Sequence, residues 1–238
     1  MRNMNITGII PARFASTRFP GKPLTDINGK TMIRRVYEQA SKSKLLQQVI
    51  VATDDERIMN EVRNFGGRVV MTSANHQNGT ERCAEAASAI QADVIINIQG
   101  DEPFIYPEQI DLLAACFTDS EVEIATLIKP QQYSKELLNP ARIKVVVNKR
   151  MEAMYFSRSI IPFERNQLNT TFYKHIGIYG FKKDLLAKLV MLKPTILEET
   201  ESLEQLRWLE NGYRIKCAVT DLESLSIDTP EDLLKLKF

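Results

Sequence analysis

Residues 6–24 read ITGIIPARFASTRFPGKPL, and this stretch decides how the first half of the chain folds. Residues 6–12 form an apolar run with the length of one buried strand, and its β-branched residues favour that conformation. The run leads into a loop that carries Arg13, Arg18 and Lys22 with small residues between them. Small residues let a backbone approach a phosphate, and fixed cations supply the counter-charge. We therefore expect a strand that opens onto an anion-binding loop.

This loop differs from two common phosphate-binding motifs. Gly21-Lys22 is followed by Pro23, so no Ser or Thr stands where a Walker A loop binds magnesium. The glycine spacing of a dinucleotide-binding loop is absent as well. An ordinary surface loop with solvated charges is the alternative. The position at the carboxyl end of a first strand favours ligand binding.

Short Val- and Ile-rich runs alternate with helical patterns through the first half of the chain. Strands are expected at 6–12, 49–54, 68–73 and 93–100, and helices at 31–42, 55–65, 81–91 and 107–117. Nearly continuous apolar strands suit a parallel sheet covered on both faces, and the alternation indicates βαβ units. In the common strand order the first and fourth strands are neighbours, which would bring Arg13 and Asp101 to opposite sides of one crevice.

The second half mixes strands with loops rich in Pro and polar residues. Strands are expected at 123–129, 143–148, 154–158, 173–181 and 214–220, and helices at 183–192 and 202–211, with a last helix from Pro230. We predict one α/β domain over residues 1–238, with a mostly parallel sheet and an inserted, partly antiparallel arm at about 131–171.

Composition excludes several classes of protein. The 238 residues are 44% hydrophobic and carry a formal net charge of +1, so the chain can bury a core but lacks the basic excess of a nucleic-acid-binding protein. Three distant cysteines without a CxxC pair suggest neither a zinc site nor a disulfide framework. No apolar stretch approaches the length of about 20 residues that spans a membrane. We expect a cytoplasmic protein that binds neither nucleic acid nor membrane.

Local signals mark several helix ends. Thr53 is expected to cap the second helix with Glu56 three residues later, and Gly66-Gly67 is expected to end that helix. Ser202 with Gln205 three residues later is a similar pattern. Glu204 and Gln205 could also bind the hydroxyls of a ligand, and both interpretations can hold together.

Two aspartates are candidates for a metal site. Asp101 follows an apolar strand in NIQGDEP, and Asp228 lies in SIDTPED. Magnesium prefers one or two carboxylates and completes its shell with water and phosphate oxygens. Capping of a helix is the alternative for Asp228, but Thr229 is better placed to cap. Near the start of another helix, Arg82 is either a contact to a bound anion or an ordinary surface arginine.

The two histidines, His76 and His175, do not have the spacing of zinc ligands. His175 lies in an expected strand, where alternation places it on one face with Gly177 and Tyr179. A lone histidine is more often structural, but a histidine beside a tyrosine favours a site for sugar hydroxyls.

Eight motifs occur in one order across essentially the whole chain, and together they resemble the 3-deoxy-manno-octulosonate cytidylyltransferase family, also called CMP-KDO synthetases. The motifs are PARFASTRFPGKPL, VATDD, NGTERCAEA, NIQGDEPFI, FSRSIIPF, HIGIYGF, SLEQLR and IDTPEDL. The resemblance implies a GT-A-like nucleotide-diphospho-sugar transferase fold, a homodimer formed through the arm, and two Mg²⁺ ions. It also implies transfer of CMP from CTP to 3-deoxy-D-manno-octulosonate (KDO), with release of pyrophosphate, for lipopolysaccharide biosynthesis.

Site residues follow from the same motifs. The resemblance implies catalytic roles for Arg13, Lys22, Asp101 and Asp228, the last two as metal ligands. It implies nucleotide contacts for Arg13, Ser16, Lys22, Arg82 and Gln99, and sugar contacts for Gln99, Arg158, His175, Tyr179, Glu204 and Gln205. The match is weakest at 221–225, where Asp-Leu-Glu-Ser-Leu stands in place of a frequent Pro-Gly pair.

Two other functions stay open at this stage. The same fold could act on sialic acid or another acidic ulosonate, including an amino-substituted one. A regulatory module that binds a nucleotide without catalysis is the second alternative, although such a module needs neither paired aspartates nor a sugar pocket. An NAD-dependent dehydrogenase is excluded because the first turn lacks the glycine fingerprint.

Overall fold

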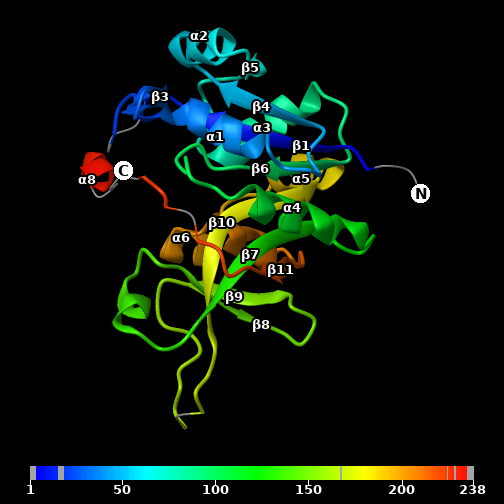
Figure 1. Ribbon diagram of the computed structural model, residues 1–238. Helices are drawn as coiled ribbons and strands as arrows, with labels where there is room; N and C mark the ends of the chain where they lie inside the picture. The colour runs from blue at the N-terminus through cyan, green and yellow to red at the C-terminus, as the bar shows by residue number, and fades with distance from the viewer. Residues whose placement is uncertain (1–3, 16–18, 167, 224, 228, 235–238) are drawn as a thin grey trace.

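The computed structural model describes residues 4–15, 19–166, 168–223, 225–227 and 229–234, and within them nine strands form one mixed sheet. Seven strands lie side by side across it (Figure 1). In spatial order they are β11 (Lys216–Val219), β7 (Ile124–Gln131), β10 (Phe172–Lys182), β6 (Val94–Asn97), β1 (Ile6–Ala12), β4 (Gln48–Thr53) and β5 (Val69–Met71). Only β10 among these seven runs against its neighbours. The prediction of a mostly parallel sheet is confirmed.

Strand β1 has the predicted bounds and lies between β4 and β6, so the predicted adjacency of the first and fourth strands is confirmed. Its successive residues Ile9 and Ile10 are both fully buried, on opposite faces of the sheet. Burial on both faces explains why the strand has a continuous apolar sequence rather than an alternating one.

Helices cover both faces of the sheet (Figure 1). On one face lie α1 (Met32–Ala40), α2 (Glu56–Asn64) and α4 (Pro107–Ala115). On the other lie α3 (Gly79–Ser88), α5 (Lys183–Leu189) and α7 (Glu204–Glu210). Short helices α6 (Ile196–Glu201) and α8 (Pro230–Leu234), and the 3-10 turns Lys22–Leu24, Cys116–Thr118 and Lys135–Leu138, complete the described helical segments.

Two expectations about helix caps are wrong. The N-cap of α2 is Asp55, whose carboxylate accepts a hydrogen bond from the Arg57 amide at 2.9 Å, whereas the Thr53 hydroxyl accepts one from the Asp55 amide. Ser202 does not cap α7, because it adopts a left-handed φ of 50° at the end of α6, which sequence reasoning missed. Gly66, with φ 79°, does end α2 as predicted.

A short hairpin follows the first loop. Strands β2 (Asp26–Ile27) and β3 (Lys30–Thr31) pair across Asn28-Gly29, both with positive φ. Asn-Gly is the residue pair that favours this tight turn, so a readable signal was missed. The hairpin orients Thr31, whose hydroxyl caps α1.

Strands β8 (Lys144–Val147) and β9 (Ala153–Ser157) form a hairpin that pairs with β10, within residues 131–171. This region and the loop between β9 and β10 extend away from the main sheet at the bottom of Figure 1. At its base the fully buried ammonium of Lys144 donates hydrogen bonds to the backbone carbonyls of Arg142, at 2.7 Å, and of Arg158. A buried cation without such acceptors would be costly, so these bonds define the conformation where the region joins the sheet.

Candidate active site

A hollow with a cavity volume of about 220 Å³ lies at the carboxyl ends of β1 and β6 and at the start of α3. This is the edge where ligands bind in open α/β sheets. The lining residues are Pro11, Ala12, Arg13, Lys22, Pro23, His76, Gln77, Asn78, Gly79, Arg82, Gln99, Gly100 and Asp101. It therefore brings together five of the predicted site residues: Arg13, Lys22, Arg82, Gln99 and Asp101.

One wall carries a cation beside a carboxylate. Lys22 Nζ lies 2.8 Å from Asp101 Oδ2, and the two side chains are 17% and 28% exposed. The same ammonium donates to the Ile227 carbonyl at 3.0 Å, and the Ile227 amide donates to the Asp101 carbonyl at 2.9 Å. A Cβ at Gly100 would lie 2.9 Å from the Pro11 carbonyl oxygen, so only glycine lets the end of β6 lie this close to β1.

The second predicted metal ligand, Asp228, and the predicted nucleotide contact Ser16 lie outside the described residues. Among the described residues, no three His, Cys, Asp or Glu side chains converge as a ready-made metal site. One half-exposed carboxylate beside an open pocket fits Mg²⁺, which takes few protein oxygens and keeps water and phosphate ligands. Asp101 meets that description.

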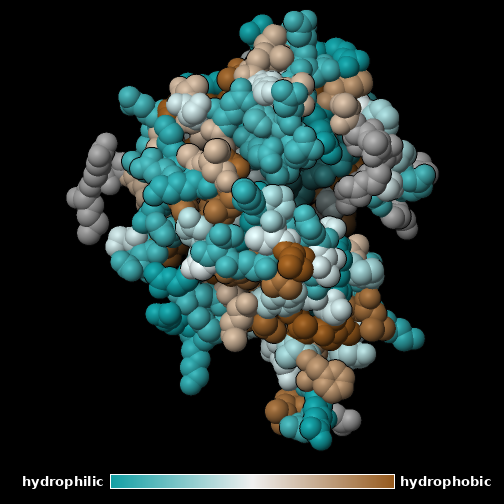
Figure 2. Space-filling model, turned by 180° about the vertical axis from the view of Figure 1, so that it is seen from behind, coloured by the Kyte–Doolittle hydropathy of each residue, from teal (hydrophilic) through white to brown (hydrophobic). Residues whose placement is uncertain are grey.

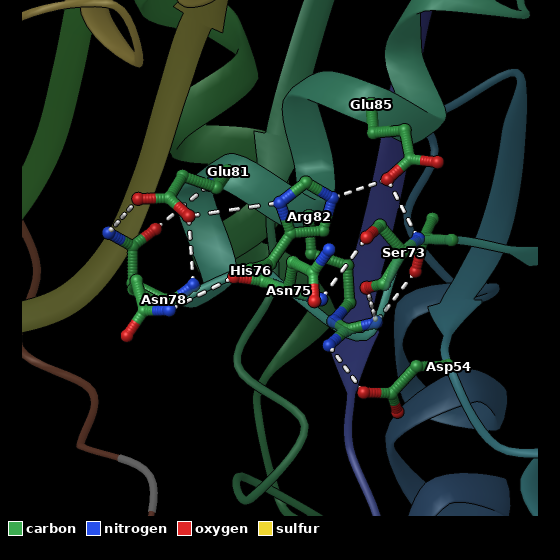
Figure 3. A network of polar contacts seen from close by, with 10 residues as sticks. Asp54, Ser73, Asn75, His76, Asn78, Glu81, Arg82 and Glu85 are labelled. Atoms are coloured by element: carbon green, nitrogen blue, oxygen red, sulfur yellow. Dashed lines mark hydrogen bonds and ion pairs between the residues drawn. The ribbon is translucent and has the colours of Figure 1, made fainter.

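Arg82 is not a surface side chain. It is 3% exposed and donates to Asp54 at 2.9 Å, to the Thr72 hydroxyl at 2.6 Å and to the Ser73 carbonyl at 3.3 Å (Figure 3). Its acceptors follow β4 and β5, so the guanidinium joins two strand ends to α3 beside the pocket. The interpretation as an ordinary surface arginine is wrong.

Two glutamates on α3 hold the segment that covers the pocket beside Arg82 (Figure 3). Glu85 accepts hydrogen bonds from the Ser73 amide, at 2.9 Å, and from His76, and these bonds lower the pKa of its carboxyl. Glu81 accepts from the Gln77 amide at 2.8 Å. Sequence reasoning missed this network, although Asn78 followed by Glu81 is a readable capping signal and Asn78 does cap α3.

The predicted sugar residues His175 and Tyr179 lie next to each other, with ring centroids 5.3 Å apart. They meet because β10 contains a bulge: Ile176 pairs with Leu127, but Tyr179 pairs with the next residue, Thr126. The Thr126 hydroxyl lies 2.8 Å from the Ile178 carbonyl and 2.9 Å from His175 Nε2. Because a hydroxyl has one proton to donate, donation to Ile178 makes the imidazole Nε2 the donor.

Burial determines the protonation of both side chains. Desolvation lowers the pKa of His175 to about 3, so the ring is neutral at physiological pH. Desolvation likewise raises the pKa of Tyr179, against an opposing effect of the nearby Thr126 hydroxyl, and Tyr179 OH is buried without a hydrogen bond of ordinary geometry among the described residues. In the neutral ring, Nδ1 of His175 can accept a hydrogen bond, and Tyr179 OH can donate one. A ligand rich in hydroxyl groups would suit both atoms.

Glu204 and Thr80 join this pair to the first pocket. The Thr80 hydroxyl donates to Glu204 at 2.6 Å, and Thr80 follows Gly79, which lines the first pocket. Burial raises the pKa of Glu204 to about 7, against the opposing effects of Thr80 and Arg207. Gln205 is 6% exposed in the same turn of α7.

The guanidinium of Arg158 is already bonded to the protein rather than free to bind a substrate. Its guanidinium donates to three backbone carbonyls: Glu201 at 2.6 Å, Pro140 at 3.0 Å and Ser202 at 3.2 Å. It therefore fixes the turn before Glu204, and a contact with a sugar would use its remaining donor capacity.

The comparisons with known proteins agree with this geometry. A family model described as a cytidylyltransferase matches residues 7–215. Relatives named 3-deoxy-manno-octulosonate cytidylyltransferase from Parabacteroides distasonis and Cytophaga hutchinsonii are 56% and 54% identical; each alignment covers 98% of this chain, and 96% and 97% of the relative. A solved structure of CMP:2-keto-3-deoxy-manno-octonic acid synthetase in complex with CTP is 42% identical, with a TM-score of 0.93 over 97% of this chain and 96% of that one.

Fold and pocket together define a nucleotidyltransferase of the Rossmann-like type. Within that class, the chain belongs to the cytidylyltransferase family and specifically to the 3-deoxy-manno-octulosonate cytidylyltransferases. In the part of the chain that the structure describes, no helix has the length and apolarity needed to cross a membrane.

Proposed function

We propose that this chain transfers CMP from CTP to 3-deoxy-D-manno-octulosonate, forming CMP-KDO and pyrophosphate for lipopolysaccharide biosynthesis. The observation that carries the proposal is the continuity of two sites across the start of α3. Gly79 and Arg82 line the cationic pocket, while Thr80 between them bonds Glu204 of the polar site. A nucleotide and an acidic sugar bound in these sites would meet at that helix end.

The chain's own residues supply positioning and charge. Arg13 and Lys22 would hold the triphosphate, and Arg82 would stabilise the nucleotide side of the pocket through the strand ends that it joins. The anomeric hydroxyl of the sugar then attacks the α-phosphorus as the bond to pyrophosphate breaks. Phosphoryl chemistry of this kind depends mainly on alignment and charge neutralisation.

We propose two Mg²⁺ ions as the cofactor. Asp101 would hold one of them together with Asp228, and the bound metal would neutralise charge on the phosphates. Before metal binds, Lys22 occupies one oxygen of Asp101 at 2.8 Å and keeps the carboxylate directed along the pocket wall. On binding of the triphosphate, the ammonium can move to the phosphates.

The sugar site would recognise hydroxyls with neutral groups. His175, Tyr179, Glu204 and Gln205 form its proposed wall, and Gln99, which lines the cationic pocket, would contact both ligands. A carboxyl with a pKa of about 7 can donate or accept at neutral pH.

We also propose a homodimer through the arm. Five of its large apolar side chains are 60–86% exposed: Tyr133, Leu138, Met154, Phe163 and Leu168. Figure 2 shows apolar side chains gathered toward the lower end of the molecule, where Figure 1 places the arm. We expect Phe163→Glu to give a monomer by light scattering, while the equally exposed Met191→Glu outside the arm leaves a dimer. A Phe163→Glu dimer would contradict the proposal.

A cytoplasmic location follows from the proposed use of CTP, and three unpaired cysteines suit a reducing compartment.

Pyrophosphate release from purified protein with CTP, magnesium and a panel of acidic sugars tests the reaction. We expect release with KDO, no release with sialic acid, and loss of release on adding a chelator. Release only with an amino-substituted or other ulosonate would change the assigned sugar but leave the proposed mechanism unchanged. CTP binding without release for any sugar would overturn the enzyme assignment in favour of a regulatory module.

A further inference from the structure

Residues 220–223 and 225–227 form a strap on the α4 side of the sheet that ends at the nucleotide pocket (Figure 1). The Thr220 amide bonds the carbonyl of Ile128 on β7, and the Leu222 carbonyl accepts from Gln109 on α4 at 3.3 Å. At the other end, the buried Ile227 is bonded to Asp101 and Lys22. Residues 221–223 and 225 of the strap belong to the stretch where the sequence departs from the family pattern.

Glu223, in the middle of the strap, lies among three cations from different parts of the fold. Its carboxylate forms an ion pair with Lys174 of β10, lies 3.1 Å from Lys129 of β7, and lies 3.7 Å from Arg142, which precedes β8. Lys174 is almost fully buried, with 7% of its side chain exposed, and Glu223 is 27% exposed.

The charges in this cluster depend on one another. Burial alone would raise the pKa of Glu223, but hydrogen bonds from Lys174 and Lys129 outweigh that effect and lower it. The only other carboxylate that the described ion pairs bring to these cations is Glu136, 3.1 Å from Arg142. Without Glu223, Lys129 and Lys174 would lose their anionic partner, and the strap would lose its ionic attachment to the sheet.

We propose that Glu223 is a positioning residue for the nucleotide site, acting through the strap on Ile227 and hence on Lys22 and Asp101. An ion-pair cluster at the base of the arm thereby determines how the C-terminal segment lies against the pocket. This inference rests on the proposed use of CTP.

Glu223→Gln tests it, because the substitution keeps the shape and removes the charge. We expect CTP binding without sugar, measured by calorimetry in the presence of magnesium, to weaken about tenfold. KM for CTP should rise by a similar factor while kcat changes less. The matched control is Glu136→Gln, which removes a carboxylate from Arg142 but lies outside the strap, and it should bind CTP within about twofold of the wild type.

Two further measurements separate positioning from a structural role. Hydrogen exchange should show faster exchange of the Ile227 amide in Glu223→Gln. A Lys129→Met, Glu223→Gln double variant should bind CTP no more weakly than Glu223→Gln alone, because Lys129 acts through Glu223.

A lower melting temperature with unchanged CTP affinity would overturn the inference, as would equal losses in Glu136→Gln and Glu223→Gln. Wild-type protein that neither binds CTP nor releases pyrophosphate would overturn the proposed function itself, so the two failures are distinguishable.

Discussion

Glu204→Gln should make the protein more stable at neutral pH and a poorer enzyme. The pKa of Glu204 is raised by burial from an ordinary 4.5 to about 7. A carboxyl that binds its proton more tightly in the folded state contributes stability that is fully present below about pH 4.5 and is lost as pH rises through about 7. Glutamine keeps the shape and an oxygen that can accept from Thr80, but it does not ionise.

The size of this effect follows from the difference in pKa. The rise from 4.5 to about 7, at roughly 1.4 kcal/mol for each pH unit, gives an upper value of about 3.5 kcal/mol. The side chain is half-buried rather than enclosed, so we expect about 2–3 kcal/mol. For a chain of this length that corresponds to a melting temperature about 5–10 °C above that of the wild type at pH 8, with little difference at pH 4.5.

Thermal or urea unfolding of both proteins between pH 4.5 and 8 provides the measurement. The control is Glu85→Gln, for which the sign is opposite: hydrogen bonds lower the pKa of Glu85, so its loss should destabilise the protein above about pH 4.5. A stability difference for Glu204→Gln that does not change with pH would refute the reasoning, because Glu204 would then ionise as an ordinary carboxyl. If KM for the sugar also rises in Glu204→Gln, the carboxylate of Glu204 contributes to sugar binding at a cost in stability.

Three other substitutions test the site. Asp101→Ala should keep the fold but lower pyrophosphate release at saturating magnesium by at least about 10²-fold, because it removes the proposed metal ligand that the structure describes. Arg82→Met should lower the free energy of unfolding, measured in urea, by about 3 kcal/mol and weaken CTP binding, because it leaves Asp54 half-buried without its cation. Thr126→Val should cost about 1–3 kcal/mol in the same assay and raise KM for the sugar, because the bulge at Ile178 loses its hydrogen bond.

Each of these has a contradicting result. Near-normal turnover of Asp101→Ala would contradict the proposal that Asp101 binds Mg²⁺. The control is Arg34→Gln, which loses an exposed ion pair within α1 and a cation–π contact with Phe65. An Arg82 variant as stable as this control would show that the buried bonds of Arg82 contribute little. A Thr126 variant with reduced stability but an unchanged KM would limit the bulge to a structural role.

Much of the nucleotide site could be predicted because it depends on where strands end. Arg13 directly follows β1, Asp101 lies in the loop that follows β6, and parallel strands place their carboxyl ends at one edge. The sequence left two interpretations of Arg82, because a position in the first turn of a helix does not determine whether the side chain is buried or exposed. Its burial depends on acceptors from β4 and β5, which only the folded sheet brings together.

Caps and bulges were less predictable because near-equivalent residues compete for them. Thr53 and Asp55 are both good caps two residues apart, and the chain uses the aspartate because the strand continues through Thr53. Likewise, Ser202 resembles a cap but takes the left-handed position that closes α6. Glu223 gave no signal in the sequence, since its three cations come from distant segments.

The bulge in β10 is a departure from regular sheet geometry that brings together two residues of the proposed sugar site. In a regular strand, residues four apart lie about 13 Å from each other, whereas the rings of His175 and Tyr179 are 5.3 Å apart. Next to them, Asn97 Oδ1, Tyr179 OH and Trp208 Nε1 are buried without a hydrogen-bond partner among the described residues. Each such group costs about 1–3 kcal/mol. Asn97 lies opposite Tyr179 in the ladder, and Trp208 packs edge-on to the same ring, so the three costs fall in one cluster. A polyhydroxylated ligand supplies both donors and acceptors, which makes a sugar the class of molecule that best offsets these costs.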